Sequence, residues 1–535
     1  MKTQNMITVG RRLLLLLVAA VAIGGCATII PGSDYPRRES VALENPGSTK
    51  IGRGIEALAK ERTPNSGFRL LPVGPDGFIT RMQMVDAAER TLDVQYFIIQ
   101  MDSTGKLIAG QILDAAQRGV RVRILIDDSN ASGRESQIVA LSAQPGIEIR
   151  VFNPFWYRGN FMPFRAFEFA LNSTRLDYRM HNKLFVVDNE VALVGGRNIG
   201  DEYFQVGGEF EFGDYDVFAA GPIVRKLSAT FDAYWNNAIS IPVEALFNGK
   251  PRDKALEEFR QDVASERREL GHQPYLQRAA AGEPLASMVS GKFPLTWAGA
   301  TVVVDSPDKS KVEKGEIVGR LMHRSVANAA IASKSEVMMV SPYLIPGREG
   351  MNMIRDIRSR NVRVRVLTNS LESNDVLGAH AAYTNYREPL LDAGVELFEV
   401  RPILGKPGGS GGVIQSGMSG HFALHAKAFV FDRQKLFIGS MNFDQRSLHL
   451  NTELGLIIES PELARQVAAR FESIAQPANS YQVLFRPDAS SPDRRIVWRT
   501  ENDKKTIEYD AEPASCSLQR IHSNLLALLP LEQEY

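Results

Sequence analysis

The sequence predicts an α/β protein of two tandem domains of like fold, each an α/β/α sandwich, related by a pseudo-two-fold axis and sharing one cleft. Strand-like and helix-like segments alternate along most of the 535 residues, which favours a mostly parallel sheet with helices on both faces. One segment, Arg118-Gly-Val-Arg-Val-Arg-Ile-Leu, recurs 242 residues later as Arg360-Asn-Val-Arg-Val-Arg-Val-Leu, identical at six of eight positions. A polar motif recurs at nearly the same offset. These observations together indicate an internal duplication.

The composition excludes several classes of protein. With 44% hydrophobic and 23% charged residues, the chain is neither disordered, collagen-like nor a multi-span membrane protein. Lys+Arg and Asp+Glu number 62 each, so no overall basic field indicates a nucleic-acid partner. Two cysteines cannot form a disulfide framework.

The amino terminus has the pattern of an export signal. Basic residues precede a short apolar run, Leu13 to Ile23, which at about 1.5 Å per residue is too short to span a bilayer comfortably. Ile23-Gly-Gly-Cys26 also resembles the lipobox of bacterial lipoproteins, in which the cysteine is lipid-modified; a plain signal peptide is the alternative. We therefore expect a signal peptide over 1–25 and a Pro/Gly/Ser-rich tether over 26–66. Cleavage would leave 59 basic and 62 acidic residues.

The remaining boundaries follow from the duplication. The first domain is expected at 67–270, with a strand over 92–99 and a helix over 105–117. After a linker over 271–300, the second domain is expected at 301–475, with a strand over 337–340 and a helix over 350–359. The extension 476–535 is expected to add strands and a short docking helix, without chemistry of its own.

The repeated polar motif is the strongest indication of function. Its first copy contains His181, Lys183, Asp188, Gly195, Gly196 and Asn198, and its second contains His425, Lys427, Asp432, Gly439, Ser440 and Asn442, with equal internal spacing. Both copies begin segments with the composition of strands, on which alternate side chains share a face, so each histidine should lie beside its lysine. Around a two-fold axis, both pairs can converge on one cleft.

This set of groups suits a phosphodiester. Lysine and asparagine donate to non-bridging oxygens, where charge develops in the transition state. Imidazole can act as nucleophile or as general acid near neutral pH, so two histidines allow a double displacement. The motifs contain no cluster of metal ligands, and no metal or other cofactor is expected.

Other members of the motif admit local interpretations. Asp188 and Asp432 are in the candidate catalytic set, but each follows a strand and begins a turn, so the expected role is to hold the hairpin behind the His–Lys pair. Gly195, Gly196 and Gly439 either end strands tightly or let the backbone approach the phosphate.

The paired motifs resemble the H-x-K-D motifs of the phospholipase D superfamily over about residues 68–475. The resemblance implies a covalent phosphohistidine, metal-independent transfer and a site at the interface of the halves. It assigns attack to His181 and acid–base catalysis to His425. It also implies a carboxylate behind each histidine, and the matching positions are Asp216 and Glu453; solvated loop acids are the alternative. Gly196 departs from the serine that is commoner in the family.

Finer features resemble bacterial cardiolipin synthases of the type-C-like group: Arg179-Met-His-Asn-Lys183, Gly195 through Phe204, and Trp297 with Asp305 and Lys309. That resemblance implies phosphatidyl transfer, with phosphatidylethanolamine as donor and phosphatidylglycerol as acceptor. The expected partners are phospholipids and a membrane surface reached through Cys26 as lipid anchor, with no nucleic acid. We expect an exported monomer facing the periplasm. Hydrolysis by a phospholipase D, a nuclease activity and a non-enzymatic scaffold remain alternatives.

Two further segments have open interpretations. The aromatic run from Phe155 to Phe167 favours either lipid contact or packing at the domain interface. The glycine-rich segment 405–420 indicates either a mobile lid over the cleft or an insertion without a role.

Overall fold

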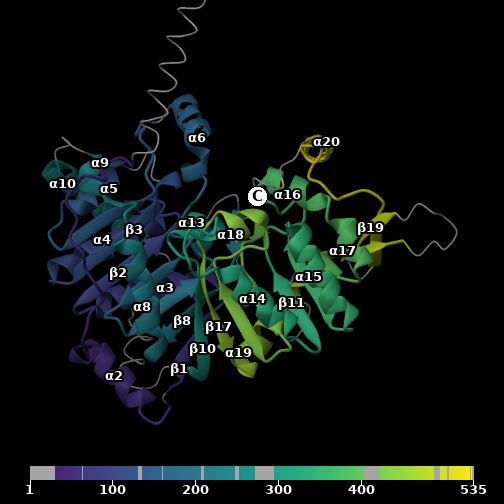
Figure 1. Ribbon diagram of the computed structural model, residues 1–535, viewed down its shortest axis with the longest axis horizontal. Helices are drawn as coiled ribbons and strands as arrows, with labels where there is room; N and C mark the ends of the chain where they lie inside the picture. The colour runs from purple at the N-terminus through teal and green to yellow at the C-terminus, as the bar shows by residue number, and fades with distance from the viewer. Residues whose placement is uncertain are drawn as a thin grey trace, which may run out of the picture.

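Two equivalent sets of strands form one continuous sheet in the computed structural model, which describes residues 30–62, 64–130, 135–159, 161–206, 210–247, 252–270, 294–402, 421–486, 495–502, 505–529 and 532. Strand β1 (Ser66–Leu71) of the first half pairs antiparallel with β10 (Thr296–Val304) of the second, so the sheet runs without interruption between the halves (Figure 1). Residues 1–25, Cys26 and segment 405–420 lie outside the described residues.

The strand order of the first half, counted toward the second half, is β9-β4-β3-β2-β5-β6-β8-β1. The strands other than β1 are β2 (Thr91–Tyr96), β3 (Arg121–Asp127), β4 (Ile147–Phe152), β5 (Leu184–Val187), β6 (Val191–Gly195), β8 (Asp216–Ala220) and β9 (Ser240–Pro242).

In the second half the equivalent strands follow in the reverse of that listing, counted from β10 away from the first half: β10-β17-β16-β15-β11-β12-β13-β18. The strands other than β10 are β11 (Glu336–Val340), β12 (Arg363–Asn369), β13 (Glu396–Val400), β15 (Ala428–Phe431), β16 (Lys435–Gly439), β17 (Leu454–Glu459) and β18 (Ser480–Phe485). The carboxyl-terminal extension adds the hairpin β19 (Ile496–Asn502) and β20 (Lys505–Tyr509) to this edge. The predicted duplicated α/β fold is confirmed.

The expectation of a mostly parallel sheet is wrong. In the described strands of the large sheet, parallel pairing is confined to β2–β3, β3–β4, β11–β12 and β12–β13. Those strands are joined by helical crossovers, whereas β5–β6 and β15–β16 are joined by short turns, which require antiparallel pairing. The sheet is therefore mixed, and its parallel strands flank the segments that contain the repeated motif.

Helices cover both faces of the sheet. In the first half they are α2 (Lys50–Ala59), α3 (Gly74–Ala87), α4 (Ser103–Gln117), α5 (Glu135–Ser142), α6 (Met162–Leu176), α7 (Asp201–Phe204), α8 (Pro222–Trp235), α9 (Val243–Leu246) and α10 (Arg252–Leu270), with 3-10 turns Pro46–Ser48 and Asp128–Asn130. In the second half they are α13 (Lys309–Glu313), α14 (Met322–Ile331), α15 (Gly347–Ser359), α16 (Leu377–Thr384), α17 (Arg387–Asp392), α18 (Gln445–His449), α19 (Pro461–Ile474) and α20 (Ser517–Leu526). Among the described helices, none combines the length and the apolar character needed to cross a bilayer.

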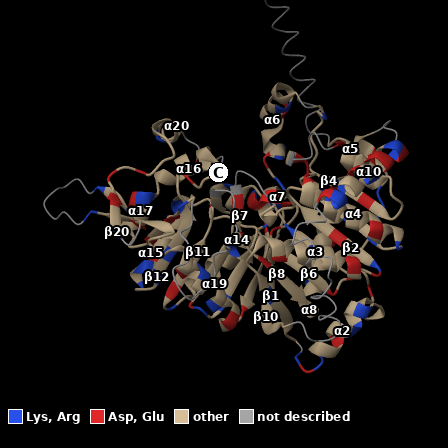
Figure 2. Ribbon diagram, turned by 180° about the vertical axis from the view of Figure 1, so that it is seen from behind, with Lys and Arg blue, Asp and Glu red and all other residues tan. Residues whose placement is uncertain are grey.

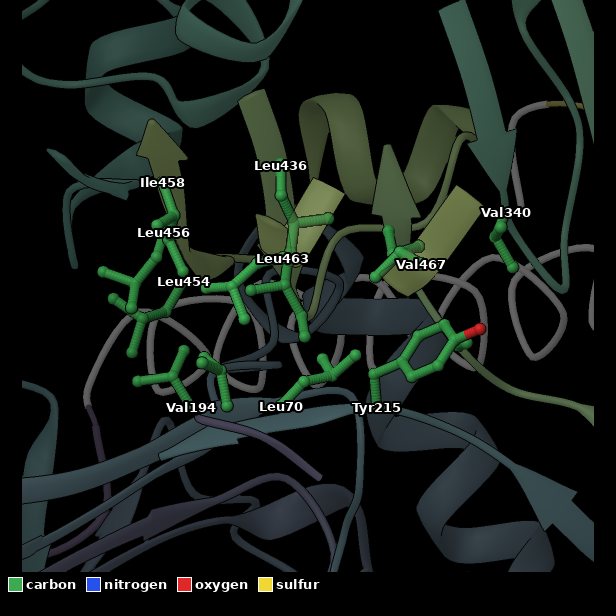
Figure 3. Packing of buried hydrophobic residues seen from close by; sticks show 14 of the residues in the cluster. Leu70, Val194, Tyr215, Val340, Leu436, Leu454, Leu456, Ile458, Leu463 and Val467 are labelled. Carbon is green, nitrogen blue, oxygen red and sulfur yellow. The ribbon is translucent and has the colours of Figure 1, made fainter. Parts of the chain in front are cut away.

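One apolar core joins the halves. It takes side chains from the sheet and from α8 and α19, while α3–α5 and α14–α15 cover two separate outer cores. Figure 3 shows Leu70, Val194 and Tyr215 of the first half facing Leu454 and Leu463 of the second. Burial of apolar surface thus holds the halves in a fixed relation.

A second, two-stranded sheet also crosses between the halves. It pairs β7 (Phe210–Gly213) with β14 (His421–Leu424) in parallel. Strands β5 and β15 begin one residue after Lys183 and Lys427, so the histidines and lysines precede these strands instead of lying within them.

Asp188 and Asp432 each hold a hairpin. Each occupies a two-residue turn with its neighbour, and all four residues have φ of 52–53°, as a type I′ turn requires. The Asp188 carboxylate accepts hydrogen bonds from the backbone N–H groups of Glu89, Arg90 and Thr91 at 2.8–3.0 Å. Asp432 similarly accepts from the backbone of residues 334, 335 and 336. Their place in the candidate catalytic set is therefore wrong, and their role is structural.

We predict that Asp188→Ala lowers the free energy of unfolding by about 3 kcal/mol, because three largely buried N–H groups lose their acceptor. Urea denaturation measures the change, with Asp356→Ala on the exposed face of α15 as control. Activity per folded molecule should persist. A variant that is as stable as the parent, yet inactive, would contradict this structural assignment.

Candidate active site

The position of His181 is set by a backbone contact between the halves. Met180 and Thr452 form a parallel bridge, in which the His181 N–H donates to the Thr452 carbonyl at 2.9 Å. The residues that follow Met180 and Thr452, which are His181 and Glu453, therefore lie side by side. His181 Nδ1 is 2.9 and 3.0 Å from the two Glu453 carboxylate oxygens.

His425 is placed by the corresponding contact. Leu424 pairs with Gly213 in the β7–β14 sheet, and the His425 N–H donates to the Gly213 carbonyl at 2.8 Å. The residues that follow, His425 and Asp214, then meet, with 2.6 Å between His425 Nδ1 and Asp214 Oδ2. Each histidine is thus held by a carboxylate of the other half, which fixes its tautomer and leaves Nε2 for chemistry.

The prediction that Asp216 orients a histidine is wrong, and the residue is Asp214. Asp216 pairs across the sheet with Gly195, and its counterpart in the second half, opposite Gly439, is Gly455. The counterpart of Glu453 therefore lies two residues before Asp216. A shift of two residues keeps the same face of a strand, so alternation could not distinguish the two aspartates. The register against the motif glycines is the signal that separates them.

Asp216 has a supporting role instead. Its carboxylate is 2.8 Å from the Arg81 guanidinium and 3.3 Å from that of Arg197. Arg197 in turn donates to the backbone carbonyl of Asp214. The buried ion pairs with Asp216 thereby fix the backbone on which the histidine-holding carboxylate sits.

A cluster of polar residues fixes the position of Glu453, and two of them, Asp305 and Lys309, belong to the type-C-like pattern. The Glu453 N–H donates to the Asp305 carboxylate at 3.0 Å, and Lys309 Nζ donates to this Asp305 carboxylate at 3.0 Å as well. Ser440 Oγ donates to the Glu453 carboxylate, so its hydroxyl serves the carboxylate here, and a role for Ser440 in binding phosphate stays a prediction. Burial, opposed by Lys183 and by the Ser440 hydrogen bond, raises the pKa of Glu453 to about 7.

The motif glycines allow this close approach. A Cβ at Gly196 would lie 2.3 Å from an Asp214 carboxylate oxygen, in the position where Ser440 donates to Glu453 in the other half. Cβ atoms at Gly195 and Gly439 would lie 2.3 and 2.5 Å from carbonyl oxygens of the adjacent strand. These glycines are required for strand packing and for the carboxylate, and their role in the approach of the backbone to phosphate stays a prediction.

The two lysines are buried and anchored to the histidine segments. Lys183 Nζ donates to the His181 carbonyl at 2.8 Å, and Lys427 Nζ lies 2.9 Å from His425 Nδ1. Burial lowers the pKa of Lys183 to about 7 and that of Lys427 to about 8, although nearby carboxylates oppose the shift. Burial and both lysines lower the pKa of each histidine, which favours the neutral form of both imidazoles in the free protein.

Both motifs form one site, because each histidine is held by a carboxylate of the other half. The pKa shifts agree with this proximity. Each histidine is affected by the lysine of the other half as well as by its own. Aromatic rings wall the site: Phe97 lies 5.0 Å from the His181 ring, and Tyr203 and Phe212 lie 5.2 and 5.1 Å from the His425 ring. Tyr203 lies in the segment Gly195 through Phe204 of the type-C-like pattern, but only the fold shows that it and the other two rings border the site.

The asparagines differ. Asn198 accepts from the Ile98 N–H at 3.3 Å and donates to the Tyr203 hydroxyl at 2.9 Å, which orients this ring. Asn442 Oδ1 is buried without a hydrogen-bond partner among the described residues, so this amide can turn to meet a ligand.

In the part of the chain that the structure describes, no group of three or more His, Cys, Asp or Glu side chains could hold a metal ion.

Comparisons with known proteins agree with this geometry. The family model described as "Cardiolipin synthase, PLD-like domain" matches residues 82–235 and 328–475. The chain is 34% identical to cardiolipin synthase C of Escherichia coli K12 over 90% of its length and 99% of the relative. It is 25% identical to cardiolipin synthase 2 of Bacillus anthracis over 60% of this chain and 50% of that protein. A crystal structure of phosphatidylserine synthase from Haemophilus influenzae matches with a TM-score of 0.52 and 14% identity, covering 80% of this chain and 91% of that one, and supports the fold.

We predict that Glu453→Gln and Asp214→Asn each reduce turnover of a phosphodiester about 10³-fold or more, because an amide cannot stabilise an imidazolium at the opposite half-site. Rates with purified protein at fixed pH test this, and Glu459→Gln on the surface is the matched control. Turnover within twofold of the parent in either variant would remove the orienting role.

We also predict that anion affinity falls as pH rises. The site lysines lose their protons in the free protein near pH 7 and 8, so above that range binding of an anion requires proton uptake. The dissociation constant for dimethyl phosphate, whose own charge is constant, should rise about tenfold per pH unit and per proton taken up. Calorimetry in buffers of different ionisation enthalpy measures both the dissociation constant and the number of protons taken up, with Lys435→Met as control. Affinity that is constant from pH 6.5 to 9 would contradict the prediction.

Proposed function

Because the chain belongs to the family of cardiolipin synthases with phospholipase D-like domains, we propose that it is a phosphatidyltransferase that makes cardiolipin from two phospholipids. The observation that carries the proposal is the pair of histidines, each held at Nδ1 by a carboxylate of the other half. That arrangement gives two Nε2 atoms with opposite tasks in a double displacement.

In the first step, His181 Nε2 attacks the phosphorus of the donor phospholipid, and a phosphorus–nitrogen bond forms. The bond between phosphorus and the headgroup oxygen breaks, and His425 Nε2–H gives its proton to the leaving alcohol. Before this step the anionic substrate offsets the charges of Lys183 and Lys427, which raises the pKa of His425 and allows it to carry the proton.

In the second step, a hydroxyl of the acceptor phospholipid gives its proton to His425 and its oxygen attacks phosphorus. The phosphorus–nitrogen bond breaks, and His181 leaves as a neutral imidazole. Lys183, Lys427 and the free amide of Asn442 donate to the non-bridging oxygens in both steps, where each donor can contribute about 3 kcal/mol. Transfer requires that the lipid alcohol, rather than water, occupies the acceptor position, and the aromatic walls around His425 favour this.

The substrates are part of the proposal. We take phosphatidylethanolamine as donor and phosphatidylglycerol as acceptor, in keeping with the relation to cardiolipin synthase C. We further propose that the protein is an exported lipoprotein, attached to a membrane through Cys26 and facing the periplasm. The basic residues, the apolar run and the small residues before Cys26 support this, and incorporation of labelled palmitate that depends on Cys26 tests it.

The decisive experiment separates transfer from hydrolysis. Purified protein in detergent receives phosphatidylethanolamine labelled in its phosphate together with phosphatidylglycerol, and the products are resolved. We expect labelled cardiolipin and free ethanolamine. Phosphatidic acid as the only labelled product would make the protein a phospholipase D and remove the synthase assignment.

The same assay tests the two histidines. His181→Ala should abolish turnover, whereas His425→Ala should lose release of the headgroup and transfer, because its proton donor is missing. Both variants should fold, and His323→Ala, outside the site, is the control. Full activity in either site variant would contradict the double displacement.

A further inference from the structure

Helix α6 has its amphipathic character inverted. Its inner face is polar: Arg165 donates to the Asp128 carbonyl at 2.7 Å, and the Glu168 carboxylate accepts from the N–H groups of Trp156 and Tyr157 at 2.6 and 2.8 Å. Its outer face is apolar and between 49% and 67% exposed, through Met162, Phe164, Phe167 and Leu171. A helix at the surface of a soluble domain normally has the opposite arrangement.

Helix α20 of the carboxyl-terminal extension shows the same inversion. Gln519 faces the protein and donates to the Leu371 carbonyl at 3.0 Å, and Ser523 is fully buried. An outward stripe at helical spacing, continued past the end of the helix, is 51–81% exposed and consists of Leu518, Ile521, Leu525, Leu528 and Leu529. The polar residues fasten both helices to the protein, so the apolar faces are left for a partner.

The two helices come from different halves but stand at the same end of the molecule. Figures 1 and 2, which are opposite views, both place α6 and α20 at the top, projecting beyond the rest of the fold. In Figure 1, α18, which follows Asn442, lies below and between them, and in Figure 2 so does β7, which leads to Asp214. The two helices therefore stand above α18 and β7, two elements that adjoin the site.

We propose that the exposed faces of α6 and α20, together with Trp156 and Phe161, form an apolar rim that docks on a lipid bilayer and brings this end of the molecule, below which the site lies, to the membrane surface. Aromatic and leucine side chains on projecting helices insert into the interfacial region of a bilayer, to a depth of about 5–10 Å. The purpose of the rim, which is to bring phospholipids to the site, rests on the proposed function. The exposed apolar faces of the two helices are observed whatever reaction the protein performs.

The place where the chain enters the described structure favours a bilayer over a second copy. Gly32 packs against Ala245 of α9 and Ile241 of β9, on the side of the molecule that carries α6. Ile30 is only four positions after Cys26, and a chain of that length reaches at most about 14 Å. A lipid on Cys26 would therefore hold this side of the protein close to the membrane, which is the geometry that the rim requires.

The test uses the mature chain from residue 27 onward, so that neither the apolar run Leu13 to Ile23 nor a lipid on Cys26 contributes to binding. Binding is measured by co-sedimentation with vesicles of phosphatidylethanolamine and phosphatidylglycerol. Glutamine retains the helices, so the test variant is Phe164→Gln, Phe167→Gln, Leu518→Gln and Leu525→Gln together. We expect vesicle partitioning to fall about tenfold or more. The control is Val41→Ser with Tyr509→Ser, two exposed apolar residues outside the rim, and it should bind as the parent does.

A second measurement distinguishes docking from catalysis. Turnover of a short-chain phospholipid below its micellar concentration should be the same in the rim variant and the parent. Partitioning that is unchanged in the rim variant would overturn the proposal, and so would a parent dimer in light scattering that the rim substitutions dissociate. A parent that is inactive on every phospholipid but still binds vesicles through the rim would instead contradict the proposed function alone.

Discussion

The whole site depends on the bond between each histidine and a carboxylate of the opposite half. His181 with Glu453 and His425 with Asp214 are set by parallel backbone contacts between Met180 and Thr452 and between Leu424 and Gly213. The shared apolar core and the β1–β10 pairing then keep these contacts in register. Packing between the halves is therefore a condition of catalysis: a displacement at the interface would separate both imidazoles from their carboxylates at once.

Burial gives the site its electrostatic character. Two lysines, two neutral imidazoles and two carboxylates share a volume from which water is largely excluded, so the pKa values of Lys183 and Lys427 fall and that of Glu453 rises. The free protein maintains this arrangement at a cost in stability, since charged forms are disfavoured there. In the proposed reaction a phosphodiester anion would supply the missing negative charge, so that substrate binding would restore the protons that the reaction uses.

The sequence alone predicts the duplication, both His–Lys pairs and the turn role of Asp188 and Asp432, because equal spacing in two copies is visible without coordinates. It could not separate Asp214 from Asp216, since residues two apart on a strand share a face and only cross-strand register distinguishes them. The mixed pairing of the sheet escaped prediction because the short turns after the motif strands override the α/β alternation. Phe97, Tyr203 and Phe212 become site residues only through tertiary contacts, which local pattern cannot express.

The difference between Gly196 and Ser440 has a wider consequence. In a symmetric dimer of single domains both half-sites would have to contain the same residue, because one gene would encode both. Joining the copies in one polypeptide removes that restriction. Here Glu453 accepts a hydrogen bond from the Ser440 hydroxyl, whereas Asp214 lies against the backbone of Gly196, which has no side chain. Divergence of this kind lets the two imidazoles acquire unequal basicity within a twofold architecture, as the proposed double displacement requires.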